Sequence, residues 1–222
     1  MRAVAVDLDG TLLDTLPDIA EAADRMLRDL GRPAAGSDVV RGYIGRGIPK
    51  LVKRLLTGAL DSEPDSDLFA RALPLFEHHY RQTFDQRSRP FPGAVEGLER
   101  MRAAGLKLAC VTNKAQAFTL PLLASTAVDR YFDLVVSGDS LPRKKPDPLP
   151  LLHIAWQFDI APAQLLLIGD SDNDTQAARA AGCPVLCVPY GYSGSGQVRD
   201  LDCDAIVADL TQAAELIVPI QS

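Results

Sequence analysis

The chain has 222 residues, and its 23 Lys and Arg against 29 Asp and Glu give a formal net charge of −6. Hydrophobic residues make up 47% of the sequence and charged residues 23%, as in ordinary soluble domains, which excludes an intrinsically disordered protein. The acidic balance excludes the usual nucleic-acid-binding protein, because phosphate backbones attract clusters of Lys and Arg.

The first strand is followed by a long helical stretch. Residues 1–8 predict a strand that stops at Asp-Leu-Asp-Gly, a sequence typical of a tight turn. A helix is expected over residues 16–30, where apolar residues recur at helical spacing, Pro17 suits the first turn and Gly31 ends the pattern. Further helical patterns cover residues 37–43, 47–56 and 67–84. No strand-like run interrupts them before Gln86, so the sequence predicts an all-helical insert.

Strand and helix patterns alternate through the rest of the chain. Helices are expected at residues 94–104, 116–125, 149–157 and 175–181, and strands at residues 106–111, 134–137, 165–168, 185–188 and 205–207. Such alternation is typical of a parallel sheet covered by helices on both faces. The predicted fold class is α/β, with a doubly wound, Rossmann-like core of residues 1–14 and 87–222. An all-helical cap domain of residues 15–86 is inserted after the first strand.

Polar residues follow four of the predicted strands. In chain order, the first strand is followed by Asp7, Asp9, Gly10 and Thr11, and the strand at 106–111 by Thr112, Asn113 and Lys114. The strand at 134–137 is followed by Asp139, Lys144 and Lys145, and the strand at 165–168 by Asp170 and Asp174. Ligands of such folds bind at the carboxyl ends of the strands, so these groups are expected to converge. Clustered carboxylates need a cation, and Mg²⁺ prefers oxygen ligands. Lysine and hydroxyl donors bind phosphoryl groups, so the set favours Mg²⁺-dependent phosphoryl transfer with an Asp as nucleophile.

Four segments resemble the ordered signatures of the haloacid-dehalogenase-like hydrolase superfamily. They are Asp7-Leu8-Asp9-Gly10-Thr11, Thr112, Lys145-Pro146 and Gly169-Asp170-Ser171-Asp172-Asn173-Asp174. The resemblance covers nearly the whole chain, and the helical insert is similar to a cap that this superfamily places there. It implies that Asp7 becomes an aspartyl-phosphate, and that Asp9 is first general acid and then general base.

The resemblance also implies roles for the remaining residues. Thr112 and the Asn113 backbone amide would bind the phosphoryl group together with Lys145, which is preferred to Lys144 because the superfamily's lysine directly precedes a proline. Asp7, Asp9 through its backbone carbonyl, and Asp170 would hold Mg²⁺. Asp174 would hold a metal-bound water or orient Lys145.

Three segments are similar to bacterial phosphoglycolate phosphatases: residues 89–93, 138–146 and 188–192. The resemblance therefore implies a small phosphorylated metabolite, 2-phosphoglycolate, as the substrate. Within the cap, Arg46 lies between two glycines, and its guanidinium is a candidate to bind a substrate carboxylate in bidentate fashion. The alternative is a solvated arginine in a helix-connecting turn. The expected hinges of the cap are Asp14-Thr15 and residues 84–90.

Other functions share part of this pattern. A phosphosugar mutase similar to β-phosphoglucomutase would keep the four signatures and return the phosphoryl group to a sugar, and a pyrophosphatase or nucleotidase would share the core. A phospho-acceptor signalling module also joins Asp, Mg²⁺, Thr and Lys on a parallel sheet. The signalling module is disfavoured, because such domains are shorter, carry the acceptor on a later strand and lack a cap.

The sequence also predicts a cytoplasmic protein without a membrane partner. Its first apolar stretch ends at Asp7, too short for the core of a signal peptide. No apolar run approaches the roughly 18 residues of a membrane span. The four cysteines contain no Cys-x-x-Cys pair, which predicts reduced thiols and no zinc site. No feature of the sequence fixes an oligomeric state.

Overall fold

A parallel sheet organises the larger part of the molecule in a computed structural model that describes residues 1–192 and 198–218. Its six strands are β1 (Ala3–Val6), β4 (Lys107–Val111), β5 (Leu134–Val136), β6 (Leu165–Gly169), β7 (Val185–Cys187) and β8 (Ala205–Ile206). Their order is β5-β4-β1-β6-β7-β8, and every pairing is parallel. After β5 the chain crosses to the other side of β1, so the sheet has its topological switch point beside β1, where such folds bind ligands.

Helices cover both faces of the sheet, as the alternating sequence pattern predicts. They are α5 (Ala94–Ala103), α6 (Gln116–Ser125), α7 (Leu149–Gln157), α8 (Asp172–Ala181) and α9 (Leu210–Ile217). Because successive strand residues point to opposite faces, Val4 and Val6 pack with α5, α6 and α9, whereas Ala3 and Ala5 pack with α7 and α8. The doubly wound α/β fold is therefore confirmed. Short 3₁₀ turns occur at η1 (Asp129–Tyr131), η2 (Pro162–Gln164) and η3 (Val198–Asp200).

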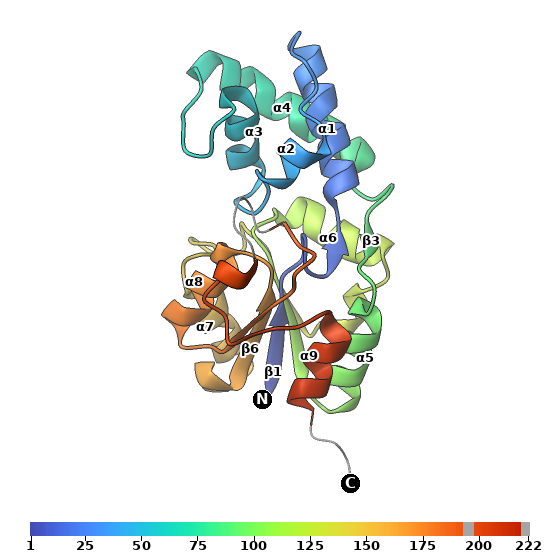
Figure 1. The fold of residues 1–222 in the computed structure, drawn as a ribbon, viewed down its shortest axis with the longest axis vertical. Coiled ribbons are helices and arrows are strands. Elements are labelled where there is room, and N and C mark those ends of the chain that lie inside the picture. The colour runs from blue at the N-terminus through green and yellow to red at the C-terminus, as the bar shows by residue number, and fades with distance from the viewer. Residues whose placement is uncertain (193–197, 219–222) are drawn as a thin grey trace.

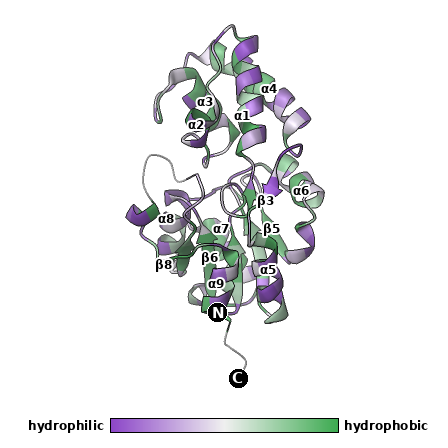
Figure 2. Ribbon diagram, turned by 45° about the vertical axis from the view of Figure 1, so that its right-hand side comes forward, coloured by the Kyte–Doolittle hydropathy of each residue, from purple (hydrophilic) through white to green (hydrophobic). Residues whose placement is uncertain are grey.

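Four helices form a separate layer above the carboxyl ends of the strands, away from the N-terminus and from α9 (Figure 1). They are α1 (Leu16–Asp29), α2 (Ser37–Arg41), α3 (Ile48–Thr57) and α4 (Ser66–Thr83). Their apolar faces meet in a core of their own that includes Met26, Val52 and Phe76. The strands of the sheet are mostly green in Figure 2, whereas the helices of this layer carry both purple and green, as expected of amphipathic helices.

A two-stranded antiparallel ribbon joins the helical layer to the sheet domain. It consists of β2 (Leu13–Asp14) and β3 (Arg89–Pro90), so the chain leaves and returns along adjacent strands. The sequence analysis did not predict this ribbon, nor helix α9, and it started α8 at residue 175 instead of Asp172. No helix within residues 1–192 and 198–218 is long and apolar enough to cross a membrane.

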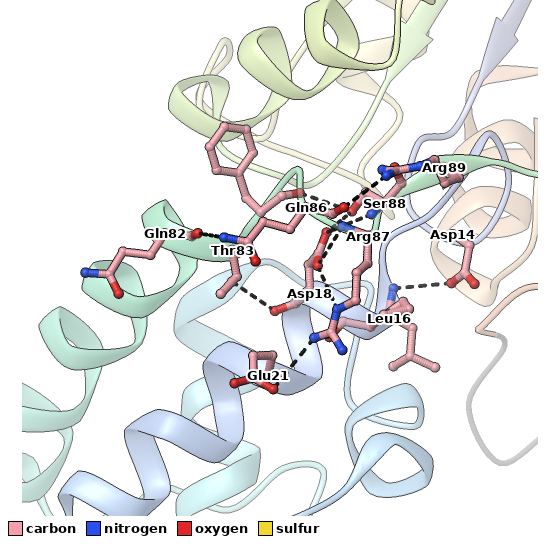
Figure 3. Close-up of polar contacts among 12 residues, drawn as sticks. Asp14, Leu16, Asp18, Glu21, Gln82, Thr83, Gln86, Arg87, Ser88 and Arg89 are labelled. Carbon is pink, nitrogen blue, oxygen red and sulfur yellow. Dashed lines mark hydrogen bonds and ion pairs between the residues drawn. The ribbon is translucent and has the colours of Figure 1, made fainter.

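A buried carboxylate fastens the returning chain to α1 (Figure 3). The side chain of Asp18 is fully buried, and it accepts hydrogen bonds from Ser88 N at 2.8 Å and Ser88 Oγ at 2.7 Å. Arg87 N also donates to it, at 3.1 and 3.0 Å from the two carboxylate oxygens. We call this group of Asp18, Arg87 and Ser88 the hinge clip.

Candidate active site

A buried lysine organises the carboxylates at the end of β1. Lys145 is 3% exposed, and its Nζ donates hydrogen bonds to Asp7 Oδ1 at 2.7 Å, to Asp174 Oδ1 at 2.6 Å and to Val111 O at 2.8 Å. Burial opposes its charge, but the carboxylates of Asp174 and Asp7 raise the pKa of Lys145 above its ordinary value. The ammonium group therefore stays protonated and fixes one oxygen of Asp7. No described residue donates a hydrogen bond to the other oxygen, Asp7 Oδ2.

Two more carboxylates come from the loop that follows β6. Asp174 lies in the first turn of α8, where its Oδ2 accepts from Ser171 Oγ at 2.7 Å and Ser171 N at 3.1 Å. Asp170 accepts from Thr11 Oγ1 at 3.1 Å and from the backbone N–H of Tyr192. These bonds fix both carboxylates beside Asp7, where the sequence motifs lead us to expect them.

The three carboxylates suit a hard cation. One oxygen from each of Asp7, Asp170 and Asp174 lies within 4.8 Å of the others. Burial raises the pKa of Asp7 to about 7, against the opposing charge of Lys145. Burial and the neighbouring Asp7 raise the pKa of Asp170 well above its ordinary value. A single ammonium thus leaves the cluster short of positive charge, and an oxygen-preferring divalent cation such as Mg²⁺ fits this donor set.

Asp9 lies apart from this cluster and has its own partners. Its Oδ1 accepts from Thr15 Oγ1 at 2.7 Å, and Lys114 Nζ lies 2.8 and 3.0 Å from its two oxygens. Its carboxylate is not among the three that could surround a cation, so Asp9 could reach the same cation only through its backbone carbonyl. Lys114 is 6% exposed, and Asp9 raises its pKa above the ordinary value although burial opposes this.

Thr112 and Asn113, which follow β4, have different partners. Thr112 is 4% exposed, and its Oγ1 accepts from Lys114 N at 3.1 Å, which leaves its hydroxyl proton free to be donated. The side chain of Asn113 instead donates to Lys145 O and to Gly45 O, both at 2.8 Å. Asn113 therefore connects the carboxylate cluster to the helical layer.

A loop of the helical layer rests on the sheet domain over the site. Gly45 O accepts from Asn113 Nδ2 and, at 3.3 Å, from Asn173 Nδ2. Lys144 Nζ donates to Arg46 O at 3.0 Å, so this lysine faces the loop and not the carboxylates. We call residues 43–47 the latch loop. The side chain of Arg46 itself is exposed.

A pocket lies between the two layers. Its polar side is formed by Asp7, Asp9, Thr112, Asn113, Lys114, Lys145, Asp170, Ser171 and Asn173. Its apolar side comes from the helical layer, with Ile19, Ile44, Ile48, Leu51, Phe76 and Tyr80. Within the part of the chain that the structure describes, the positively charged side chains lining this pocket are Lys114 and Lys145. Arg46 does not line it.

Two residues of the site, Tyr80 and Tyr192, were not expected there from the sequence. Lys114 was expected among the groups at the strand ends, but nothing in its spacing connects it to Asp9. Tyr80 has the helical spacing of a core residue. Tyr192 accepts from Thr15 N at 2.8 Å and Leu16 N at 2.9 Å, and donates to Asp14 Oδ1 at 2.5 Å. Its contacts thus link Asp170 to the start of α1.

Comparison of the sequence with models of known protein families shows the family to which the chain belongs. A model of the haloacid dehalogenase-like hydrolase family matches residues 4–188, most of the chain. The chain belongs to this family. The match confirms the resemblance carried by the four motifs, and it identifies this haloacid dehalogenase-like hydrolase as an enzyme.

Relatives of this hydrolase match nearly its full length. A phosphoglycolate phosphatase of Nitrosospira multiformis is 59% identical over 217 residues, covering 98% of this chain and 96% of the relative. A plasmid-encoded phosphoglycolate phosphatase of Cupriavidus necator is 47% identical, covering 98% of this chain and 93% of the relative. The crystal structure of a predicted phosphoglycolate phosphatase from Haemophilus somnus is 33% identical. It superposes with a TM-score of 0.92 and covers 97% of both chains.

Proposed function

We propose that this hydrolase is a Mg²⁺-dependent phosphomonoester hydrolase that acts through an aspartyl-phosphate and cleaves 2-phosphoglycolate into glycolate and phosphate. The observation that carries the proposal is the arrangement of Asp7, which Lys145 holds through one oxygen while the other stays available. A second carboxylic acid, Asp9, stands two residues further on with separate partners. The names of the close relatives support the choice of substrate.

In the first step, Asp7 Oδ2 attacks phosphorus and the bond from phosphorus to the leaving-group oxygen breaks. Asp9 donates its proton to that oxygen, so it departs as a hydroxyl group and not as an alkoxide. The Thr112 hydroxyl donates to an oxygen of the phosphoryl group as it transfers, and the nearby charge of the Lys145 ammonium, whose donors hold Asp7 and Asp174, offsets the negative charge of that group. The four groups act together because strands β1, β4 and the loop before α7 end at the same edge of the sheet.

In the second step, Asp9 takes a proton from a water molecule that attacks phosphorus. The bond from phosphorus to Asp7 breaks, and inorganic phosphate leaves with Asp9 protonated again. Mg²⁺, held by Asp7, Asp170 and the Asp9 carbonyl, would offset the negative charge of the phosphoryl group and the carboxylates. Asp174 keeps Lys145 in place through both steps.

We also propose that residues 15–86 work as a movable cap. Its apolar side chains line the pocket opposite the carboxylates, and closing it would exclude water that is not needed for the reaction. The ribbon of β2 and β3 is the connection through which this cap would move relative to the sheet domain.

The test is phosphate release with and without Mg²⁺ from 2-phosphoglycolate, β-glucose 1-phosphate, pyrophosphate, AMP and para-nitrophenyl phosphate. We expect Mg²⁺-dependent release, with kcat/KM for 2-phosphoglycolate about tenfold or more above the others, a difference of about 1.4 kcal/mol in transition-state binding. Release at one similar rate from all compounds would contradict the substrate. Formation of glucose 6-phosphate from β-glucose 1-phosphate would indicate a mutase instead.

The covalent step has its own test. Asp7→Asn removes the nucleophile and should lower kcat by about three orders of magnitude or more, with little change in the thermal unfolding temperature. The matched control is Asp172→Asn, an exposed carboxylate of the same motif, which should keep kcat within about twofold. A folded Asp7→Asn enzyme with near-normal kcat would rule out the aspartyl-phosphate.

A further inference from the structure

Among the described residues, two lysines line the pocket, and Lys114 is the one that the mechanism above does not assign to the phosphoryl group. The three N–H donors of Lys145 are all engaged, by Asp7, Asp174 and Val111 O. Lys114 donates to the two oxygens of Asp9. An ammonium group has three donors, so one donor of Lys114 is not held by Asp9, and the residue lines the pocket together with Tyr80.

A buried hydroxyl group lies next to this lysine. Lys114 Nζ is 5.1 Å from the centre of the Tyr80 ring, and Tyr80 comes from α4 of the helical layer. Tyr80 is 1% exposed, and within the described residues its Oη donates a hydrogen bond to no acceptor. Burial raises the pKa of Tyr80 to about 12, against the nearby charge of Lys114, so the phenol keeps its proton. Buried hydroxyl groups are normally satisfied, which points to a ligand as the missing acceptor.

The position of these two donors relative to Asp9 limits what that ligand can be. Asp9 must contact the leaving-group oxygen in order to protonate it. Lys114 Nζ lies 2.8 Å from Asp9, so it lies next to whatever the leaving group carries close to that oxygen. The facing side chains Ile19, Leu51 and Phe76 are apolar, so they offer an anion no other counter-charge.

Resting on the phosphatase function proposed above, we propose that Lys114 and Tyr80 bind a carboxylate on the leaving group of the substrate. The ammonium supplies the counter-charge and the phenol donates a hydrogen bond. In 2-phosphoglycolate one CH₂ group separates the ester oxygen from the carboxylate, which matches the short distance between Asp9 and Lys114. The enzyme then selects phosphomonoesters of 2-hydroxy acids, and Arg46, whose side chain lies outside the pocket, does not make this selection.

The test compares 2-phosphoglycolate with 2-hydroxyethyl phosphate, in which a neutral hydroxymethyl group replaces the carboxylate. The measured quantity is the ratio of kcat/KM for the two compounds. Lys114→Met should lower this ratio by about 30-fold or more, and Tyr80→Phe, which removes a single hydroxyl, by about fivefold. Lys114→Met is also expected to slow both reactions because Lys114 holds Asp9, and for this reason the ratio is the readout.

Two further variants serve as comparisons. Lys50→Met removes an ammonium of α3 that pairs with Asp61 outside the pocket, and it should leave the ratio within about twofold. Arg46→Met tests the alternative that this arginine reads the carboxylate. A large fall of the ratio for Arg46→Met with none for Lys114→Met would overturn the proposal.

Binding gives a readout that does not depend on turnover. In the Asp7→Asn background, calorimetry should show that Lys114→Met and Tyr80→Phe each weaken binding of 2-phosphoglycolate more than binding of 2-hydroxyethyl phosphate. Equal weakening of both compounds would show that Lys114 acts only through Asp9. A wild-type enzyme that hydrolyses both compounds equally well would refute carboxylate recognition but keep the phosphatase. Selective binding without any hydrolysis would refute the phosphatase but keep the carboxylate site.

Discussion

The hinge clip and the latch loop both hold the helical layer on the sheet domain, but their hydrogen-bond acceptors differ. The acceptor is a carboxylate at the hinge clip and a backbone carbonyl at the latch loop. At the hinge clip, the charged and fully buried Asp18 accepts hydrogen bonds from the backbone and side chain of Ser88 and from Arg87 N. At the latch loop, the acceptors are the neutral backbone carbonyls of Gly45 and Arg46. Bonds to a buried charge are costly to break, whereas single bonds to a neutral carbonyl contribute about 1 kcal/mol each. If residues 15–86 move as proposed, we therefore expect the hinge side to stay closed and the latch side to open.

Removing the acceptor of the hinge clip should have the largest effect. Asp18→Ala leaves the buried N–H and hydroxyl groups of Ser88 and the partly buried N–H of Arg87 without this acceptor, and we expect the free energy of unfolding to fall by about 3 kcal/mol. Urea denaturation measures this loss. The control is Asp29→Ala, because Asp29 also joins α1 to α4, through His79 at 2.6 Å, but is 44% exposed. It should cost at most about 1 kcal/mol, and equal losses would contradict the importance of the buried charge.

A latch-loop variant should change substrate binding more than stability. Asn173→Ala removes the bond to Gly45 O, so we expect about a fivefold shift toward the open state and a similar rise in KM. Hydrogen exchange of the amides in residues 43–47 should quicken to a similar extent, with the free energy of unfolding changed by less than about 1 kcal/mol. The control is Gln176→Ala, an exposed residue of the same helix. Unchanged exchange in the latch loop would show that Asn173 does not hold it.

The smallest effect is expected from the lysine of the latch side. Lys144→Met removes the bond to Arg46 O, but the ammonium is half-exposed and water replaces most of what is lost. We expect KM to change by less than about twofold. KM is measured for both variants. A larger rise in KM for Lys144→Met than for Asn173→Ala would show that the main contact of the latch loop is made by Arg46 O and not by Gly45 O.

The sequence predicted the elements that bury a periodic apolar face. Strand β6 and helix α7 were found at almost their true bounds, because their residues pack on the sheet at regular spacing. The cluster of Asp7, Lys145 and Asp174 was also expected, because each residue follows a strand and parallel strands end at one edge. The ribbon of β2 and β3 has strands of two residues, too short for any alternation to be visible.

The contacts that the sequence did not reveal join the two layers or distant parts of the chain. Lys114 was expected at the strand ends, but it meets the Tyr80 ring only because α4 is placed above the end of β4. Tyr80 has the spacing of an ordinary core aromatic, and its unpaired hydroxyl is visible only in three dimensions. Asp18 reads as a routine acidic residue in the first turn of a helix, a position favoured by the helix dipole. Nothing in one sequence shows that Ser88, far along the chain, donates to it.

The ribbon of β2 and β3 has a consequence for how this architecture can change. Leu13 faces Pro90 and Asp14 faces Arg89, so the two ends of the helical layer meet as neighbours in a hairpin. A tight turn of two residues is enough to connect such neighbours. The sheet domain therefore does not depend on the helical layer to close its own chain path. We therefore expect that the whole layer can be exchanged without loss of the fold of the sheet domain, and that such an exchange would change the preferred substrate more than the carboxylate cluster.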